Sequence, residues 1–116
     1  MLESIEIRGF KSLRSVAVDL GRLVVVFGPN AAGKSNLLES LVLLSRCVAE
    51  RTLAEAFEEG VRGYPLEAFS LPLGGLPALL GSEQASLRLG ATLRLPNRDP
   101  LRYEVEVAIR PATGEL

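Results

Sequence analysis

Eight consecutive residues in the first third of the chain have types and spacing suited to holding a polyphosphate. Residues 28–35 read GPNAAGKS and match the pattern G-x-x-x-x-G-K-[ST] in full. Gly28 and Gly33 let the backbone wrap closely enough for its N–H groups to point at phosphate oxygens. Lys34 supplies a mobile positive charge, and the Ser35 hydroxyl is suited to binding Mg²⁺. The expected phosphate-binding residues are Gly28, Ala31, Ala32, Gly33, Lys34 and Ser35.

Such a loop needs a strand to deliver it and a helix to carry its end, and the sequence predicts both. Residues 23–27 read LVVVF, a continuous apolar run typical of a central strand that is buried on both faces. From Ser35 onward apolar residues recur at helical spacing, which predicts a helix whose N–H groups and positive dipole end face the phosphates. The apolar face is so wide that we expect this helix to be nearly engulfed. Its apolar residues are Leu37, Leu38, Leu41, Val42, Leu43, Leu44 and Val48.

The chain between residues 52 and 85 reads as a short helix followed by a connection. Thr52 and Glu55 have the spacing of a capping box, which predicts a second helix that ends at Gly60. A single helix running through Thr52 is the alternative. Residues 60–85 are rich in Gly and Pro and are typical of a loop-like connection, with one helical turn as an option at residues 76–80.

Strands are expected at both ends of the chain. Residues 2–8 and 16–20 predict two short strands, and residues 86–110 predict an antiparallel hairpin around the turn PNRDP. The hairpin alternates apolar and charged residues, so one face is wet and carries cross-strand charge pairs rather than a DNA groove. Those charged residues are Arg88, Arg94, Arg102, Glu104 and Glu106. The predicted fold class is α/β with α+β character, in which a mixed sheet and the loop helix are joined by an antiparallel hairpin layer.

Composition narrows the function classes. The chain has 116 residues, enough for one domain with a modest core, and its net charge of −1 gives no general reason to expect nucleic-acid binding. It has no histidine, which excludes His-based triads and His metal sites, and Cys47 is its single cysteine. The thiol falls in an apolar helical stretch and is expected to be buried and inert. We found no secretion signal and no membrane-spanning run, which favours a cytoplasmic location.

The first 41 residues resemble a known family. The residues that carry the resemblance are Phe10-Lys11-Ser12, Asn30 within the loop, and Asn36-Leu37-Leu38 after it. The stretch resembles the N-terminus of the ABC-type ATPases of the RecF, structural-maintenance-of-chromosomes and overcoming-lysogenization-defect (OLD) group. The Asn-Ala-x-Gly-Lys-Ser-Asn loop is most similar to the OLD-type and related AAA-labelled members. The resemblance implies a P-loop NTPase N-terminal lobe that binds ATP with Mg²⁺.

The resemblance also implies roles for residues outside the glycines. Asn30 would contact the γ-phosphate, Asn36 belongs to the nucleotide-binding segment, and Lys11 would lie near the nucleotide. A solvated loop charge is the alternative for Lys11. Gln84 is a candidate for the glutamine that senses Mg²⁺ and γ-phosphate in this group, although its setting is typical of a turn before a strand. Arg62 is a candidate for the arginine that follows the first helices, and a structural role is the alternative.

Parts required for hydrolysis are missing from the sequence. No apolar strand ends in the Asp-Glu pair that holds Mg²⁺ and positions water, and the signature serine loop is missing too. In the resembling families these parts come from a second half. We therefore expect residues 1–116 to be a single N-terminal lobe, from a truncated or split ATPase. By resemblance, the parent would form a head-to-head dimer acting in DNA repair or phage defence. A protein-interaction module with a structural loop and part of a small-molecule kinase are the alternatives.

Overall fold

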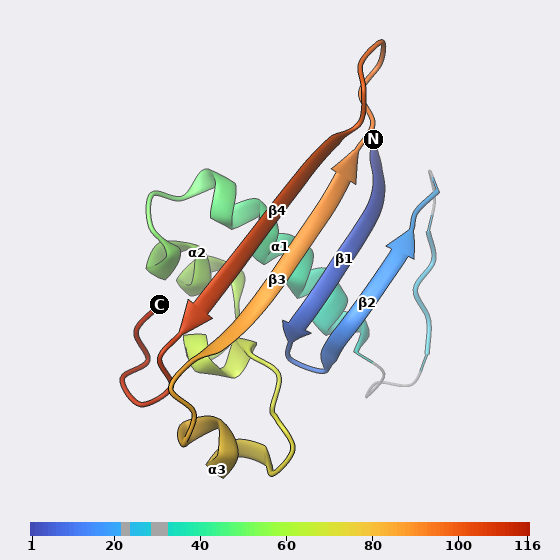
Figure 1. Cartoon of the computed structure of the whole chain (residues 1–116). Helices are drawn as coiled ribbons and strands as arrows, with labels where there is room; N and C mark the ends of the chain where they lie inside the picture. The colour runs from blue at the N-terminus through green and yellow to red at the C-terminus, as the bar shows by residue number, and fades with distance from the viewer. Residues whose placement is uncertain (22–23, 29–32) are drawn as a thin grey trace.

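The computed structural model describes residues 1–21, 24–28 and 33–116. Four strands form one sheet, with helices packed on one of its faces (Figure 1). The elements in chain order are β1 (Leu2–Phe10), β2 (Leu13–Asp19), α1 (Lys34–Ala49), α2 (Leu53–Gly60), a 3-10 turn η1 (Pro65–Ala68), α3 (Gly75–Leu80), β3 (Ala85–Leu93) and β4 (Leu101–Ile109).

The sheet has the order β2-β1-β3-β4 and every pair is antiparallel. The predicted β3–β4 hairpin is confirmed, and the two predicted N-terminal strands pair as a second hairpin, β1–β2. The two hairpins do not form separate layers. β1 pairs with β3, as where Ile7 lies opposite Leu89, so one sheet joins the two ends of the chain. The prediction of a mixed sheet was wrong for the described residues. Apolar faces on both inner strands merge because each hairpin alone leaves an apolar face in water.

Residues 24–27 depart most from the prediction. The run was expected to be a buried central strand, yet these residues form no strand, and Val25 and Phe27 are 72% and 87% exposed. Residues 22 and 23 lie outside the described part of the chain. A run of β-branched residues becomes a central strand only where strands and covering helices lie on both sides of it. The four described strands pair with one another and not with this run.

Helix α1 covers the sheet with one face and is not engulfed as predicted. Leu43 and Leu44 are buried, whereas Leu38 and Val48 are 61% and 66% exposed. Its buried face packs against α2 and the sheet, in a core that includes Phe10, Phe57, Phe69, Ile7, Leu87, Leu89, Val107 and Ile109.

The second helix confirms the predicted N-cap at Thr52 but not the full capping box, because the Glu55 carboxylate accepts from Arg51 N–H instead of Thr52 N–H. Thr52 is the N-cap of α2, and its hydroxyl accepts a 3.2 Å hydrogen bond from the Glu55 backbone N–H. The helix ends at Gly60, where an added Cβ would lie 3.2 Å from the Cα of Leu43 on α1. Helix α1 ends at Ala49 and α2 begins at Leu53, so the single-helix alternative was wrong. The predicted helical turn at residues 76–80 is part of α3, while η1 was not predicted.

Candidate functional site

The two ends of the predicted phosphate loop lie close together. Lys34 Nζ donates a 2.6 Å hydrogen bond to the Gly28 carbonyl, across the six positions that separate them. Gly33 has a φ of +88°, a left-handed conformation that favours glycine, and serves as the N-cap of α1. Its carbonyl accepts the first helical bond, from Leu37 N–H at 2.9 Å. The lysine thus spans the loop, and the helix begins immediately after its last glycine. Of the predicted binding residues, Asn30, Ala31 and Ala32 lie outside the described residues.

The first turn of α1 is suited to an anionic ligand. Ser35 is exposed at the second helical position. No side chain caps the turn and none of its residues is acidic. Its free N–H groups and positive dipole end are therefore not neutralised by a side chain of the same turn. Among the described residues, no group of three or more metal-binding side chains occurs. The Ser35 hydroxyl is an oxygen donor of the kind that Mg²⁺ accepts.

The turn between β1 and β2 packs against the end of the phosphate loop. Asn36 Nδ2 donates a 2.8 Å hydrogen bond to Ser12 Oγ. A Cβ placed on Gly33 would lie 3.1 Å from the same Ser12 oxygen. The tertiary structure thus brings Ser12 beside Gly33, at the end of the predicted phosphate loop. The amide nitrogen of Asn36, a predicted nucleotide-binding residue, bonds to this turn.

Lys11 is held in that turn by its backbone as well as its side chain. Its φ of 47° is unusual for a residue with a side chain. Its N–H donates to the Ala68 carbonyl at 2.8 Å, and its own carbonyl accepts from Ser70 Oγ at 2.7 Å. Its side chain is only 17% exposed. The neighbouring segment fixes the backbone conformation of Lys11, and its side chain is mostly shielded from solvent. The alternative of a solvated loop charge is therefore wrong.

Glu39 is the partner of both candidate cations. Its Oε1 accepts from Lys11 Nζ at 2.6 Å and from Arg62 N–H at 3.1 Å, and its Oε2 accepts from Arg62 Nε at 2.8 Å. Burial alone raises the pKa of the Glu39 carboxyl, but the hydrogen bonds from Lys11 and Arg62 outweigh it and hold that pKa below its ordinary value. The carboxylate is therefore charged at neutral pH. Sequence reasoning missed Glu39, although an acidic residue on the apolar face of a predicted helix was a usable signal.

A pocket of about 690 Å³ opens beside this cluster. The cationic side chains Lys11, Arg14 and Arg62 contribute to its lining, together with Ser12. Apolar side chains of the 66–79 segment, among them Phe69 and Leu79, form much of the remaining wall, and the acidic side chain of Glu67 also lines it. The combination suits a ligand with an anionic part and a flat apolar part. A larger hollow at the β3–β4 turn includes Met1. Because Met1 precedes β1 and Lys11 follows it, the two hollows lie at opposite ends of that strand.

Gln84 lies away from this cluster. It directly precedes β3 and lines a small hollow with Arg110 and Glu115 of the C-terminal turn, without any residue of the phosphate loop. This agrees with its expected place in a turn. Cys47 is half-buried and burial raises the pKa of its thiol, which fits the expected unreactive side chain.

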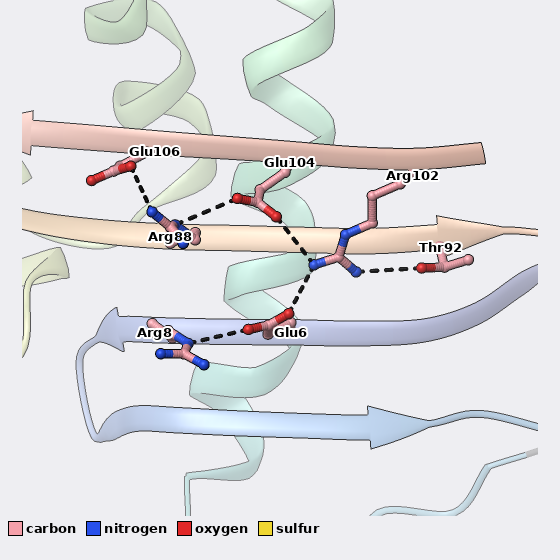
Figure 2. Close-up of polar contacts among 7 residues, drawn as sticks. All are labelled: Glu6, Arg8, Arg88, Thr92, Arg102, Glu104 and Glu106. Carbon is pink, nitrogen blue, oxygen red and sulfur yellow. Dashed lines mark hydrogen bonds and ion pairs between the residues drawn. The ribbon is translucent and has the colours of Figure 1, made fainter.

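The outer face of the sheet carries the charge pairs predicted for the hairpin. Arg88 contacts Glu106 at 2.9 Å, and Arg102 contacts Glu6 of β1 at 2.9 Å (Figure 2). These side chains lie on the face opposite α1 (Figure 2). The cations of these pairs are matched by neighbouring carboxylates, so the prediction of a wet face with paired charges is confirmed. Within the described residues, no helix combines the length and apolar character needed to cross a membrane.

Comparison with known protein families identifies the family of this chain. A family model described as the AAA ATPase domain matches residues 1–61, just over half of the chain. The matched segment contains the phosphate loop, the β1–β2 turn and Glu39, and it ends one residue before Arg62. No curated protein matches the sequence.

Proposed function

We propose, from the premise that this chain belongs to the AAA ATPase domain family, that residues 28–35 bind the phosphates of ATP together with Mg²⁺. Membership in the family implies nucleotide binding. The observation that supports the assignment to this loop is a hydrogen bond of 2.6 Å. Lys34 Nζ, at the start of α1, donates it to the Gly28 carbonyl. It closes the two described ends of the loop around one ammonium group.

Different groups of the chain make different interactions with the nucleotide. Lys34 exchanges its carbonyl partner for phosphate oxygens, because a charge-assisted hydrogen bond to phosphate is stronger than a bond to a neutral carbonyl. The N–H groups at the start of α1 and the helix dipole favour the negative charge. Ser35 offers its hydroxyl to Mg²⁺, which when bound neutralises phosphate charge. By family resemblance, Asn30 contacts the γ-phosphate.

The pocket beside the β1–β2 turn supports a place for the nucleoside. Its apolar wall, including Phe69 and Leu79, suits a planar base, and its cations suit the adjoining phosphate. Ser12 connects this pocket to the loop, since it lines the pocket and lies against Gly33. The whole nucleotide would then span from Lys34 to the pocket.

Hydrolysis would require a further part of the ATPase. The described residues hold no cluster of acidic groups near Ser35 that could complete a Mg²⁺ site. The exposed apolar run at residues 24–27 supports a second half that covers it, as in the RecF- and OLD-like ATPases that the sequence resembles. On this proposal, residues 1–116 are one lobe of an ATPase head, and the parent forms a head-to-head dimer. A parent role in DNA repair or phage defence rests on resemblance alone.

The same exposed run favours a second candidate function. Val25 and Phe27 are 72% and 87% exposed, and large apolar side chains at a surface are typical of a protein interface. In this alternative the loop is structural and the chain is an interaction module. It would form a stable oligomer and have no measurable affinity for nucleotide.

A titration of the chain with ATP, with and without Mg²⁺, tests the proposal, with phosphate release followed in the same sample. We expect binding without sustained turnover. Lys34→Ala should lose a charge-assisted bond of about 1.5–3 kcal/mol, which is roughly a 10- to 150-fold rise in Kd. Arg98→Ala, in the β3–β4 turn, is the matched control and should bind like the wild type. Equal binding by Lys34→Ala would refute the loop assignment, and no binding by the wild type would favour the interaction module.

A further inference from the structure

Glu39 is a buried acidic side chain, and burial of a charged group costs free energy. It is 8% exposed on a helix whose buried face is otherwise formed by residues such as Leu43 and Leu44. Glutamate is rarely buried unless it is paired, and a buried ion pair is often no more stabilising than apolar residues of similar size. An apolar residue would therefore fill this position at least as well, and stability alone does not account for the carboxylate.

The carboxylate connects three separate segments of the chain. It belongs to α1, it accepts a hydrogen bond from Lys11 in the β1–β2 turn, and it accepts two from Arg62 after α2. The sequence separations are 28 and 23 residues. Both oxygens are used, and the side-chain contacts are 2.6 and 2.8 Å. A single group thus sets the relative positions of these segments.

These segments are also the ones that surround the predicted nucleotide. Glu39 lies four positions after Ser35, so both residues are on the same side of α1, and helical side chains lean toward the N-terminus. Lys11 and Arg62 line the pocket. Ser12, next to Lys11, contacts Asn36 and Gly33 at the loop. Glu39 therefore lies between the phosphate loop and the pocket wall.

We infer that Glu39 is a positioning residue of the nucleotide site, which fixes Lys11 and Arg62 on the pocket wall relative to the phosphate loop. This inference rests on the proposed ATP binding. Glu39 acts through its two partners and does not itself contact the nucleotide. Its role is to hold the β1–β2 turn and the segment after α2 in the arrangement that receives a polyphosphate.

The change in the Kd for MgATP caused by Glu39→Gln distinguishes three roles of Glu39. These are positioning of the site, an effect of its charge alone, and a contribution to folding alone. The substitution removes one negative charge, so an effect through the electric field alone would tighten the binding of anionic MgATP. A role in folding alone would lower thermal stability and leave the Kd of the folded protein unchanged. Positioning predicts weaker binding, by about tenfold, as is typical when groups that orient a binding site are changed.

The experiment is a MgATP titration of the wild type, Glu39→Gln, Arg62→Gln and the double variant, at a temperature where circular dichroism shows each to be folded. Glu50→Gln is the matched control, because it breaks the 3.3 Å pair with Arg46 at the far end of the same helix. We expect a higher Kd in both single variants. We expect the double variant to lose less than the product of the two effects, because the two residues act on the site through one contact. Glu50→Gln should match the wild type.

Several outcomes would overturn the inference. A folded Glu39→Gln that binds MgATP as well as or better than the wild type would do so. If Glu39→Gln does not fold, Arg62→Gln decides the matter, because its side chain is 73% exposed and Glu39 keeps its contact with Lys11, so this variant should still fold. Wild-type affinity in Arg62→Gln would then refute the positioning role. Absence of MgATP binding by the wild-type chain would instead mark failure of the proposed function itself.

Discussion

Replacing Gly33 with alanine tests whether the β1–β2 turn and the phosphate loop form one unit. Gly33 has a φ of +88°, and an added Cβ would lie 3.1 Å from Ser12 Oγ and 3.4 Å from Leu13 Cδ2. The left-handed conformation costs a residue with a side chain about 1–2 kcal/mol. Reduced freedom of the unfolded chain returns up to about 1 kcal/mol. Displacement of Ser12 adds about 1 kcal/mol, at the lower end of the range for overpacked contacts.

A second glycine in the chain separates the free-energy cost of the left-handed backbone from the cost of the contact with Ser12. Gly114 has a φ of +73°, and nothing lies within 4 Å of an added Cβ. Gly114→Ala therefore carries the backbone cost without the contact. We expect Gly33→Ala to lower the free energy of unfolding by about 2 kcal/mol and Gly114→Ala by about 1 kcal/mol. For a chain of this size, the difference is about 4 °C in Tm.

Urea unfolding and MgATP titration of the two variants together give the test. Because the contact moves Ser12 away from Asn36, Gly33→Ala should also weaken MgATP binding about tenfold, as expected for a shifted supporting group. Gly114→Ala should bind normally. If the two variants lose the same stability, or if Gly33→Ala keeps the wild-type Kd, the turn and the loop do not support each other as described.

Two further predictions concern the core and acid stability. Phe57 is 1% exposed and stacks on Phe69 with a centroid distance of 6.2 Å, so Phe57→Ala should lower the unfolding free energy by about 3–5 kcal/mol. Phe27→Ala, at an 87% exposed residue, should change it by less than about 0.5 kcal/mol in the same urea titration, and equal losses would contradict the described core. The folded-state pKa of Glu39 is lowered, so its contribution to stability is present above its unfolded pKa of about 4.3 and is lost as the pH falls through the folded pKa. As the pH is lowered below about 4.3, stability should therefore fall less steeply in Glu39→Gln than in the wild type, and parallel curves would show that Glu39 does not titrate as inferred.

Local chemistry accounts for what could be predicted from the sequence. Gly33 and Lys34 stand in a motif whose glycine is needed for a left-handed turn, and the structure has that turn at the start of α1. Thr52 caps α2 because its hydroxyl reaches the backbone N–H of Glu55, only three positions away. The alternation that predicted β3 and β4 depends on a period of two residues within one hairpin. Each of these features is decided by neighbours in the chain.

The remaining features depend on contacts between distant segments. Whether the run at residues 24–27 becomes a buried strand depends on partners, and among the described residues it remains exposed. The pairing of β1 with β3 and the meeting of Lys11, Glu39 and Arg62 involve residues more than 20 positions apart. The sequence by itself determined the glycine turn at Gly33, the helix that follows it, the two N-terminal strands and the β3–β4 hairpin. Only the tertiary structure decided that Glu39 joins the turn and Arg62 to that helix, because a buried carboxylate takes whichever cations the packing brings within hydrogen-bonding distance.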